Sequence, residues 1–280
     1  MPPRIFETSI DWTAGRGDKW LANLVPVEAQ LAPVDAPLVE ALRLDRPYRI
    51  ADVGCGGGRT TLAMQARAPA GSILHGFDIS PALVEAARSR TDGSLVFEVA
   101  DMGTAAPPGA PYDRLGSRFG VMFFADPPGA FANLRRWLAP GGRFAFAVWG
   151  APADNPWLTT MDAVVDEVCG PPAAPPQPDA PGPFRYGNVA PFVALLTAAG
   201  FRDVQVNDWR GPLPLGGGLP AAQAAPFALG AFAQYAERLM QAGAEATPTA
   251  TARLAERLAS HVKSDGKVWM DACVHLVTGA

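Results

Sequence analysis

The sequence has few of the residues that bind metal ions or form disulfide bonds. Its 280 residues include three cysteines and three histidines, and the cysteines at positions 55, 169 and 273 are far apart, without the C-x-x-C spacing of a metal site. Scattered thiols of this kind are typical of reduced cysteines in a cytosolic protein. We therefore expect no metal site and no disulfide framework.

Long apolar runs and an excess of basic residues are also missing. No stretch approaches the ~20 apolar residues that cross a membrane, and the first residues (MPPRIFE) lack the apolar run of a signal peptide. The formal net charge is −4, whereas a nucleic-acid-binding surface usually needs a basic face. We expect a soluble, cytoplasmic protein that binds neither membranes nor nucleic acids; its oligomeric state stays open, a homodimer included.

Short apolar runs alternate with helical patterns in the first half of the chain. Hydrophobic residues make up 49% of the sequence, so a substantial core can form. This alternation predicts an α/β fold with a mainly parallel, doubly wound sheet and helices on both faces. The expected strands are residues 49–54, 73–78, 94–100, 112–117 and 143–149. The expected helices are residues 60–68, the segment that begins at Ser80 and Pro81, and residues 126–138.

The second half is less regular. Residues 171–183 contain seven prolines and are expected to form a loop or lid. The remaining expected elements are a helix at 189–199, a sixth strand at 201–209, helices at 220–241 and 248–264, and a last strand at 267–277.

The turn after the first expected strand is rich in glycine. Residues 52–58 have the sequence DVGCGGG, and glycine lets the backbone turn sharply and approach a ligand. The following helix directs its free N–H groups at the same place. A dinucleotide fingerprint, G-x-G-x-x-G, would need glycine at position 59, which is Arg59, or at position 61, which is Thr61. The loop thus predicts a nucleotide-like ligand, and its glycine spacing does not match the dinucleotide fingerprint.

Acidic residues follow at the ends of the next two expected strands. Asp78 lies about 20 residues after the loop, where doubly wound folds place a carboxylate that accepts hydrogen bonds from ribose hydroxyls. Asp101 can accept from the exocyclic amine of an adenine, while Met102 and Ile79 can cover the two faces of the ring. All four lie at the carboxyl ends of strands, which is where such sheets bind ligands.

Together these features resemble the class I S-adenosylmethionine (SAM)-dependent methyltransferases, whose first motif is acidic-x-Gly-x-Gly-x-Gly. Residues 112–124 (YDRLGSRFGVMFF), 138–144 (LAPGGRF) and 154–157 (DNPW) are similar to small-molecule methyltransferases related to the ubiquinone and menaquinone C-methyltransferases. The resemblance covers residues 48–157 well and the remainder in outline. It implies a Rossmann-like sheet of seven strands with an antiparallel last strand, helical N-terminal and lid segments, SAM as cofactor and S-adenosylhomocysteine as product.

The resemblance also implies a set of cofactor contacts. The acidic residue of the first motif, Asp52, can help to hold the cationic groups of SAM. The expected cofactor-binding residues are Trp20, Asp52, Gly54, Cys55, Gly56, Asp78, Ile79, Asp101, Met102 and Ser117.

A small-molecule methyl acceptor is expected on the other side of the cofactor's methyl group. Several large apolar side chains fall in segments that could cover this end, although each could equally be ordinary core; as a group they suggest an apolar or aromatic acceptor. They are Trp12, Phe119, Met122, Trp149, Trp157 and Tyr186. The transfer itself would be an in-line displacement, for which the protein supplies orientation and a dry cavity.

No side chain stands out as a general base, so no catalytic residue is assigned. His75, His261 and His275 are better explained as structural residues than as a base. Residues 126–129 (DPPG) resemble the D-P-P-Y motif of nucleic-acid amino-methyltransferases, but Gly129 occupies the aromatic position. A helix N-cap at Asp126 is the favoured interpretation.

We interpret the chain as one methyltransferase domain in four parts. These are an N-terminal helical cap (1–48), a SAM-binding core (49–150), a lid and helix (151–200), and C-terminal strands with a helical insertion (201–280). An alternative is a SAM-fold protein that binds the cofactor without methyl transfer, as a cyclase or a binding subunit. An NAD-dependent oxidoreductase is the less favoured third hypothesis.

Overall fold

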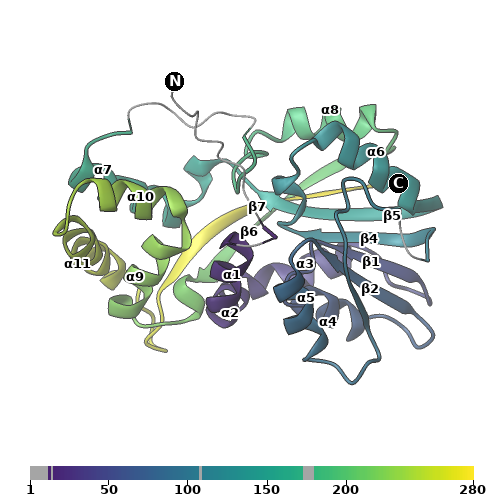
Figure 1. Cartoon of the computed structure of the whole chain (residues 1–280), viewed down its shortest axis with the longest axis horizontal. Helices are drawn as coiled ribbons and strands as arrows, with labels where there is room; N and C mark the ends of the chain where they lie inside the picture. The colour runs from purple at the N-terminus through teal and green to yellow at the C-terminus, as the bar shows by residue number, and fades with distance from the viewer. Residues whose placement is uncertain (1–11, 14, 107–108, 173–179) are drawn as a thin grey trace, which may run out of the picture.

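A seven-stranded sheet forms the centre of the computed structural model, which describes residues 12–13, 15–106, 109–172 and 180–280 (Figure 1). Its strand order is β3-β2-β1-β4-β5-β7-β6, and β7 runs antiparallel to both of its neighbours. The other neighbouring pairs are parallel. The predicted doubly wound sheet with a reversed last strand is confirmed. The strands are β1 (Arg49–Val53), β2 (Ile73–Asp78), β3 (Val96–Val99), β4 (Tyr112–Arg118), β5 (Leu138–Trp149), β6 (Gln205–Pro214) and β7 (Trp269–Gly279).

Helices cover both faces of the sheet and one of its ends. Two predicted helix starts are confirmed by their caps: Ser80 accepts a hydrogen bond from the backbone N–H of Leu83, and Asp126 accepts one from Gly129. The DPPG segment therefore begins a helix, as favoured above. The helices are α1 (Gly15–Ala22), α2 (Leu24–Leu31), α3 (Asp35–Ala41), α4 (Arg59–Gln65), α5 (Pro81–Arg88), α6 (Pro127–Trp137), α7 (Pro156–Cys169), α8 (Val189–Ala198), α9 (Ala221–Ala231), α10 (Ala233–Gln241) and α11 (Ala246–Ala259).

The sixth strand differs from its predicted bounds of 201–209. Asp203 has a positive φ of 52°, so the chain turns there and regular pairing with β7 begins only at Gln205. The strand then continues through Pro212 and Pro214, because β6 lies at the edge of the sheet, where a missing backbone donor is tolerated.

The helical predictions for the second half need three corrections. The single helix expected at 220–241 is two helices, because Phe232 has an extended backbone (φ −110°, ψ 113°) that separates α9 from α10. The helix expected at 248–264 ends at Ala259. Helix α7 was not predicted, although its buried residues Trp157, Met161, Val164 and Val165 follow helical spacing. Part of the proline-rich lid, residues 173–179, lies outside the described residues.

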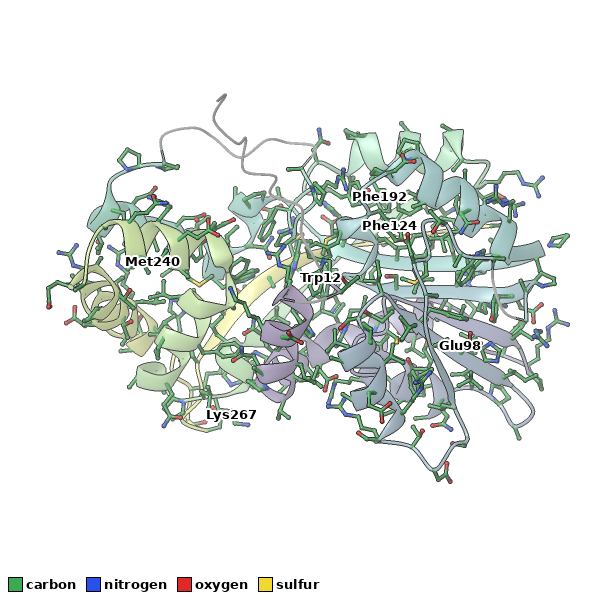
Figure 2. The ribbon with its side chains drawn as sticks, in the orientation of Figure 1. Trp12, Glu98, Phe124, Phe192, Met240 and Lys267 are labelled. Carbon is green, nitrogen blue, oxygen red and sulfur yellow. The ribbon has the colours of Figure 1, made fainter. Side chains whose placement is uncertain are left out.

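Helices α7, α9, α10 and α11 form a cluster beside the sheet (Figure 1). Inside it, the hydroxyl of Tyr235 in α10 donates a hydrogen bond of 2.6 Å to Asp162 of α7. Helices α1 and α2 lie between this cluster and the sheet, and Trp12 lies at the same junction (Figure 2). Among the residues that the structure describes, no helix has the length and hydropathy needed to span a lipid bilayer.

Candidate active site

The loop between β1 and α4 closes the carboxyl end of the first strand with glycine-specific geometry. Its backbone is held by N–H groups of Gly54 and Cys55, which both donate to the carbonyl of Phe77 at 2.8 and 2.9 Å. Gly54 has a φ of 72°, and a Cβ there would stand 2.9 Å from the Cα of Gly120. A side chain at this position would collide with the backbone of Gly120, so the loop needs glycine there to pack against the turn after β4.

Asp78 is held against this loop at the end of β2. Its carboxylate accepts hydrogen bonds of 2.9 Å from the backbone N–H groups of Gly56 and Ser80. The residue is 8% exposed, and burial raises the pKa of its carboxyl group. The carboxylate is thus fixed in place and retains lone pairs that can accept from a ligand.

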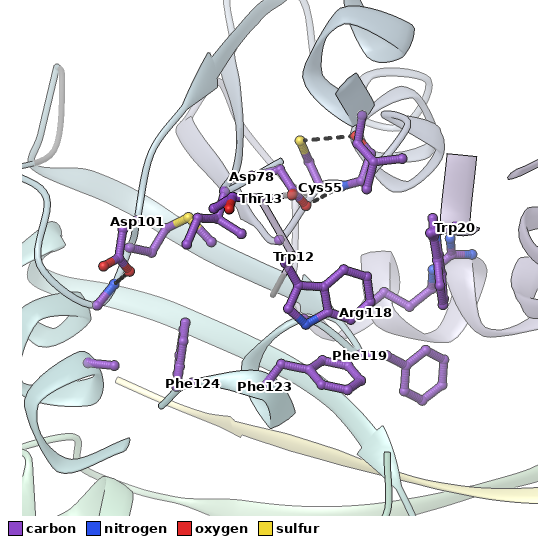
Figure 3. A pocket seen from close by; sticks show the side chains of 18 of the residues that line it. Trp12, Thr13, Trp20, Cys55, Asp78, Asp101, Arg118, Phe119, Phe123 and Phe124 are labelled. Carbon is purple, nitrogen blue, oxygen red and sulfur yellow. Dashed lines mark hydrogen bonds between the residues drawn. The ribbon is translucent and has the colours of Figure 1, made fainter. Parts of the chain in front are cut away.

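A cavity of about 370 Å³ opens in front of the loop (Figure 3). In this view Asp101 and Phe124 lie at one end and Trp20 at the other, with Asp78 and Cys55 along one wall and Trp12 and Phe123 opposite. The structure brings eight of the ten predicted cofactor residues to this cavity. They are Trp20, Gly54, Cys55, Gly56, Asp78, Ile79, Asp101 and Met102.

The other two predicted contacts, Asp52 and Ser117, do not line the cavity. Asp52 is 1% exposed and accepts a 2.6 Å hydrogen bond from the hydroxyl of Thr61 in α4. Ser117 is fully buried and donates to the carbonyl of Val53 at 2.6 Å. Both side chains point behind the glycine loop, so their positions support the loop and do not support the predicted contact with the cofactor.

Charged residues that were not predicted as cofactor contacts lie beneath the loop. Arg118 lines the cavity and forms a 2.9 Å ion pair with Asp35, and burial lowers the pKa of its guanidinium group. Glu28 also lines the cavity and pairs at 2.8 Å with Arg90, which donates in turn to the carbonyl of Gly57. Helix α2 and the end of β4 thus bring both charge signs to one end of the cavity. The position of Glu28 at the cavity results from the long-range packing of α2, which no local sequence pattern shows.

A second cavity, of about 430 Å³, adjoins the first. Leu31 and four aromatic residues line both cavities. We call the four aromatic residues the aromatic wall: Trp12, Trp20, Phe119 and Phe123. Met122, Trp149 and Trp157, predicted as acceptor contacts, line the second cavity. Tyr186 lines neither cavity, and its ring stacks on Phe192 of α8 with 4.1 Å between centroids; its role as an acceptor contact stays a prediction.

Phe119 lines both cavities, and its backbone conformation is unusual. It has a φ of 63°, in the left-handed region that a residue with a large side chain rarely adopts. Its N–H donates to Ala147 at 2.9 Å, and its ring stacks on Trp149 at 4.4 Å. Such strain is concentrated at functional sites, where the surrounding structure maintains it.

None of the three histidines lines either cavity. His75 contacts the hydroxyl of Tyr112 at 2.7 Å, and His275 contacts Asp208 at 2.6 Å. Their interpretation as structural residues agrees with these positions.

Comparison with known proteins identifies the central domain. Residues 50–142 match the family described as "Methyltransferase domain", and this match spans the glycine loop, Asp78 and Asp101. These residues form a class I SAM-dependent methyltransferase domain. Over 176 residues it is 34% identical to a trans-aconitate 2-methyltransferase of Methylobacterium nodulans, covering 62% of this chain and 64% of that protein. Over 112 residues it is 33% identical to a demethylmenaquinone methyltransferase of Deinococcus radiodurans, covering 39% and 46% respectively.

A solved structure shares the fold of this chain. A putative methyltransferase from an antibiotic biosynthesis pathway of Anabaena variabilis superposes with a TM-score of 0.60, at 14% identity, over 89% of this chain and 97% of that chain. The matched region spans less than two thirds of the length of the two curated relatives.

The first cavity fits SAM, the cofactor of this family. Its floor is the glycine loop, where Gly54, Gly56 and Gly57 line the cavity without side chains. The indole N–H of Trp12, a cavity residue, is buried without a hydrogen-bond partner among the described residues, so it is available to a ligand. The cavity contains anionic, cationic and aromatic side chains. SAM consists of an adenosine, a sulfonium and an amino acid, and these parts require all three kinds of group.

Asp52 should make the stability of the protein depend on pH. Burial raises the pKa of its carboxyl group from 3.8 to about 7. Between about pH 4 and pH 7 the folded chain therefore keeps a proton that the unfolded chain has lost, and the free energy of unfolding should fall as the pH rises, by up to about 1.4 kcal/mol per pH unit. Asp52→Asn cannot ionise, so it should flatten this slope. Urea denaturation at pH 5, 6 and 7 measures the free energy of unfolding of both proteins. Equal slopes with pH for the two proteins would contradict the raised pKa of Asp52.

Proposed function

We propose that this chain transfers a methyl group from SAM to a small apolar or aromatic molecule. The observation that carries the proposal is the pair of adjoining cavities, one at the glycine loop and one lined by aromatic residues, which share the wall of Trp12, Trp20, Phe119 and Phe123. A cofactor in the first cavity and an acceptor in the second would meet at this wall.

The residues of the first cavity orient the cofactor in this proposal. Asp78 accepts from the ribose hydroxyls, and Asp101 accepts from the adenine amine at the end marked by Phe124 (Figure 3). Asp101 already accepts from the N–H of Gly103 and the hydroxyl of Thr104, at 2.9 and 3.0 Å, which fixes its carboxylate. Met102 and Ile79 cover the adenine ring.

The opposite end of the cavity receives the amino-acid part. Arg118 would hold its carboxylate and Glu28 its ammonium group, and Trp20 and Phe119 would line the neighbouring part of the cavity. Bound SAM supplies a methyl group on a positively charged sulfur. Aromatic faces stabilise a cation nearby and exclude water, and they hold the acceptor in line with the bond that breaks.

The second cavity supports an apolar acceptor. Its volume of about 430 Å³ is in the range of small-molecule pockets, and its walls include Trp149, Trp157 and Phe232. The relatives named trans-aconitate 2-methyltransferase and demethylmenaquinone methyltransferase support a small-molecule acceptor as a class.

The proposal is tested by measuring the formation of S-adenosylhomocysteine. The protein is incubated with SAM and a panel of small aromatic compounds, and both the product nucleoside and the methylated compound are quantified by mass spectrometry. We expect acceptor-dependent formation of the two in equal amounts. A different result would show a SAM-fold protein that does not transfer methyl groups. In that case the protein would bind SAM tightly and alter a panel compound chemically, but it would form neither a methylated compound nor S-adenosylhomocysteine.

A further inference from the structure

The second cavity has two cations on one of its walls. Arg16 and Lys19, three residues apart on the same face of α1, both line it. Among the described residues that line this cavity there is no aspartate or glutamate to balance them. The facing wall is apolar and includes Trp157, Met161 and Phe227. The cavity is therefore polarised, with positive charge on the α1 side.

Arg16 lies at the wall that the two cavities share. Its guanidinium carbon is 5.5 Å from the ring centroid of Trp12 and 5.8 Å from that of Phe123. Trp12 occupies the junction between the helical cluster and the sheet (Figure 2). The guanidinium group is thus held by aromatic rings beside the place where the acceptor meets the cofactor.

The charge of Arg16 is only weakly compensated by protein groups. The group is half-buried, and burial lowers the pKa of its guanidinium. Glu237 of α10, an exposed residue, is the carboxylate whose charge acts on it, and no ion pair or hydrogen bond of the Arg16 side chain occurs among the described residues. A half-buried guanidinium with free donors favours an anionic partner, and its planar fork suits a carboxylate.

We propose that the methyl acceptor is an anion, a small aromatic or apolar carboxylate whose charged group is bound by Arg16 with help from Lys19. This inference rests on the proposed function. The apolar body occupies the region of Trp149, Trp157 and Phe232, and the carboxylate lies on the α1 side. Neutral molecules of the same shape leave the guanidinium without its partner and bind less well.

The test compares acids with their uncharged amides. Calorimetry measures the binding of 2-naphthoate, 3-phenylpropionate and the two corresponding carboxamides to the protein saturated with S-adenosylhomocysteine. We expect each acid to bind about tenfold more tightly than its amide, as a charge-assisted hydrogen bond predicts. Arg16→Met should remove this preference, and Arg16→Lys should restore part of it. Arg46→Met is the matched control, because Arg46 also lies over an aromatic ring, 5.1 Å from Tyr48, but lines neither cavity.

Three results overturn the proposal: equal affinity for acid and amide, no binding of either, or an unchanged preference in Arg16→Met. A loss of S-adenosylhomocysteine affinity in Arg16→Met with acid binding intact would also overturn it, since Arg16 would then belong to the cofactor cavity. Failure of the proposed function is distinct: the unaltered protein would not bind SAM, or it would bind the acids selectively without methylating any compound of the panel.

Discussion

Replacing Asp78 with alanine should raise the Kd of SAM by about 100-fold. A carboxylate that accepts from two ribose hydroxyls contributes about 1.5–3 kcal/mol through charge-assisted bonds, and each 1.4 kcal/mol corresponds to a factor of ten. The substitution also removes the acceptor that fixes the N–H groups of Gly56 and Ser80 at 2.9 Å, so the glycine loop loses an anchor. Calorimetric titration with SAM measures the change.

Asp92→Ala is the matched control for this experiment. Asp92 accepts a 3.0 Å hydrogen bond from the N–H of Ser94, two residues later, much as Asp78 accepts from Ser80, but it lines neither cavity. We expect it to leave the Kd unchanged. If Asp78→Ala folds with a normal circular dichroism spectrum and binds SAM as tightly as the Asp92→Ala control does, the assignment of the ribose contact to Asp78 is wrong.

Replacing Asn155 with alanine should lower the free energy of unfolding by about 3–5 kcal/mol, since buried groups that lose their only partners cost about 1–3 kcal/mol each. The side chain is fully buried between β5, α7 and β7. Its oxygen accepts from the indole N–H of Trp157 and the backbone N–H of Cys273, both at 3.1 Å. Its nitrogen donates to the carbonyl of Ala151 at 2.9 Å.

Urea denaturation followed by circular dichroism measures this loss. Asn188→Ala serves as the comparison, because the side chain of Asn188 only caps α8 at the surface, accepting from Ala190 at 3.2 Å. A cap of this kind contributes about 1 kcal/mol. Equal, small losses in the two variants would contradict the role of Asn155 as the hydrogen-bonded link between the sheet and α7.

The sequence predicts the part of the site that lies on strand ends. Gly54, Asp78 and Asp101 each follow a strand of a parallel sheet, and the topology alone brings the carboxyl ends of such strands to one edge. Their spacing along the chain therefore translates into closeness in space. The same reasoning fails for Asp52, which lies inside β1 and not at its end, and whose carboxylate accepts a hydrogen bond from Thr61 of α4.

The remainder of the site depends on packing that a local pattern does not encode. Glu28 and Arg16 reach the cavities because α1 and α2 lie between the helical cluster and the sheet, a position that no strand spacing specifies. The stacking of Tyr186 on Phe192 of α8 is a long-range contact of the same kind. Backbone breaks are equally hidden: the positive φ of Asp203 delays β6, and the extended Phe232 divides a helix.

The cavity at the glycine loop should bind SAM and not a dinucleotide. Calorimetric titration of the unaltered protein with SAM, S-adenosylhomocysteine and NAD tests it most directly. We expect saturable binding of SAM and S-adenosylhomocysteine, one molecule per chain, and no binding of NAD. Tight binding of NAD without binding of SAM would contradict it.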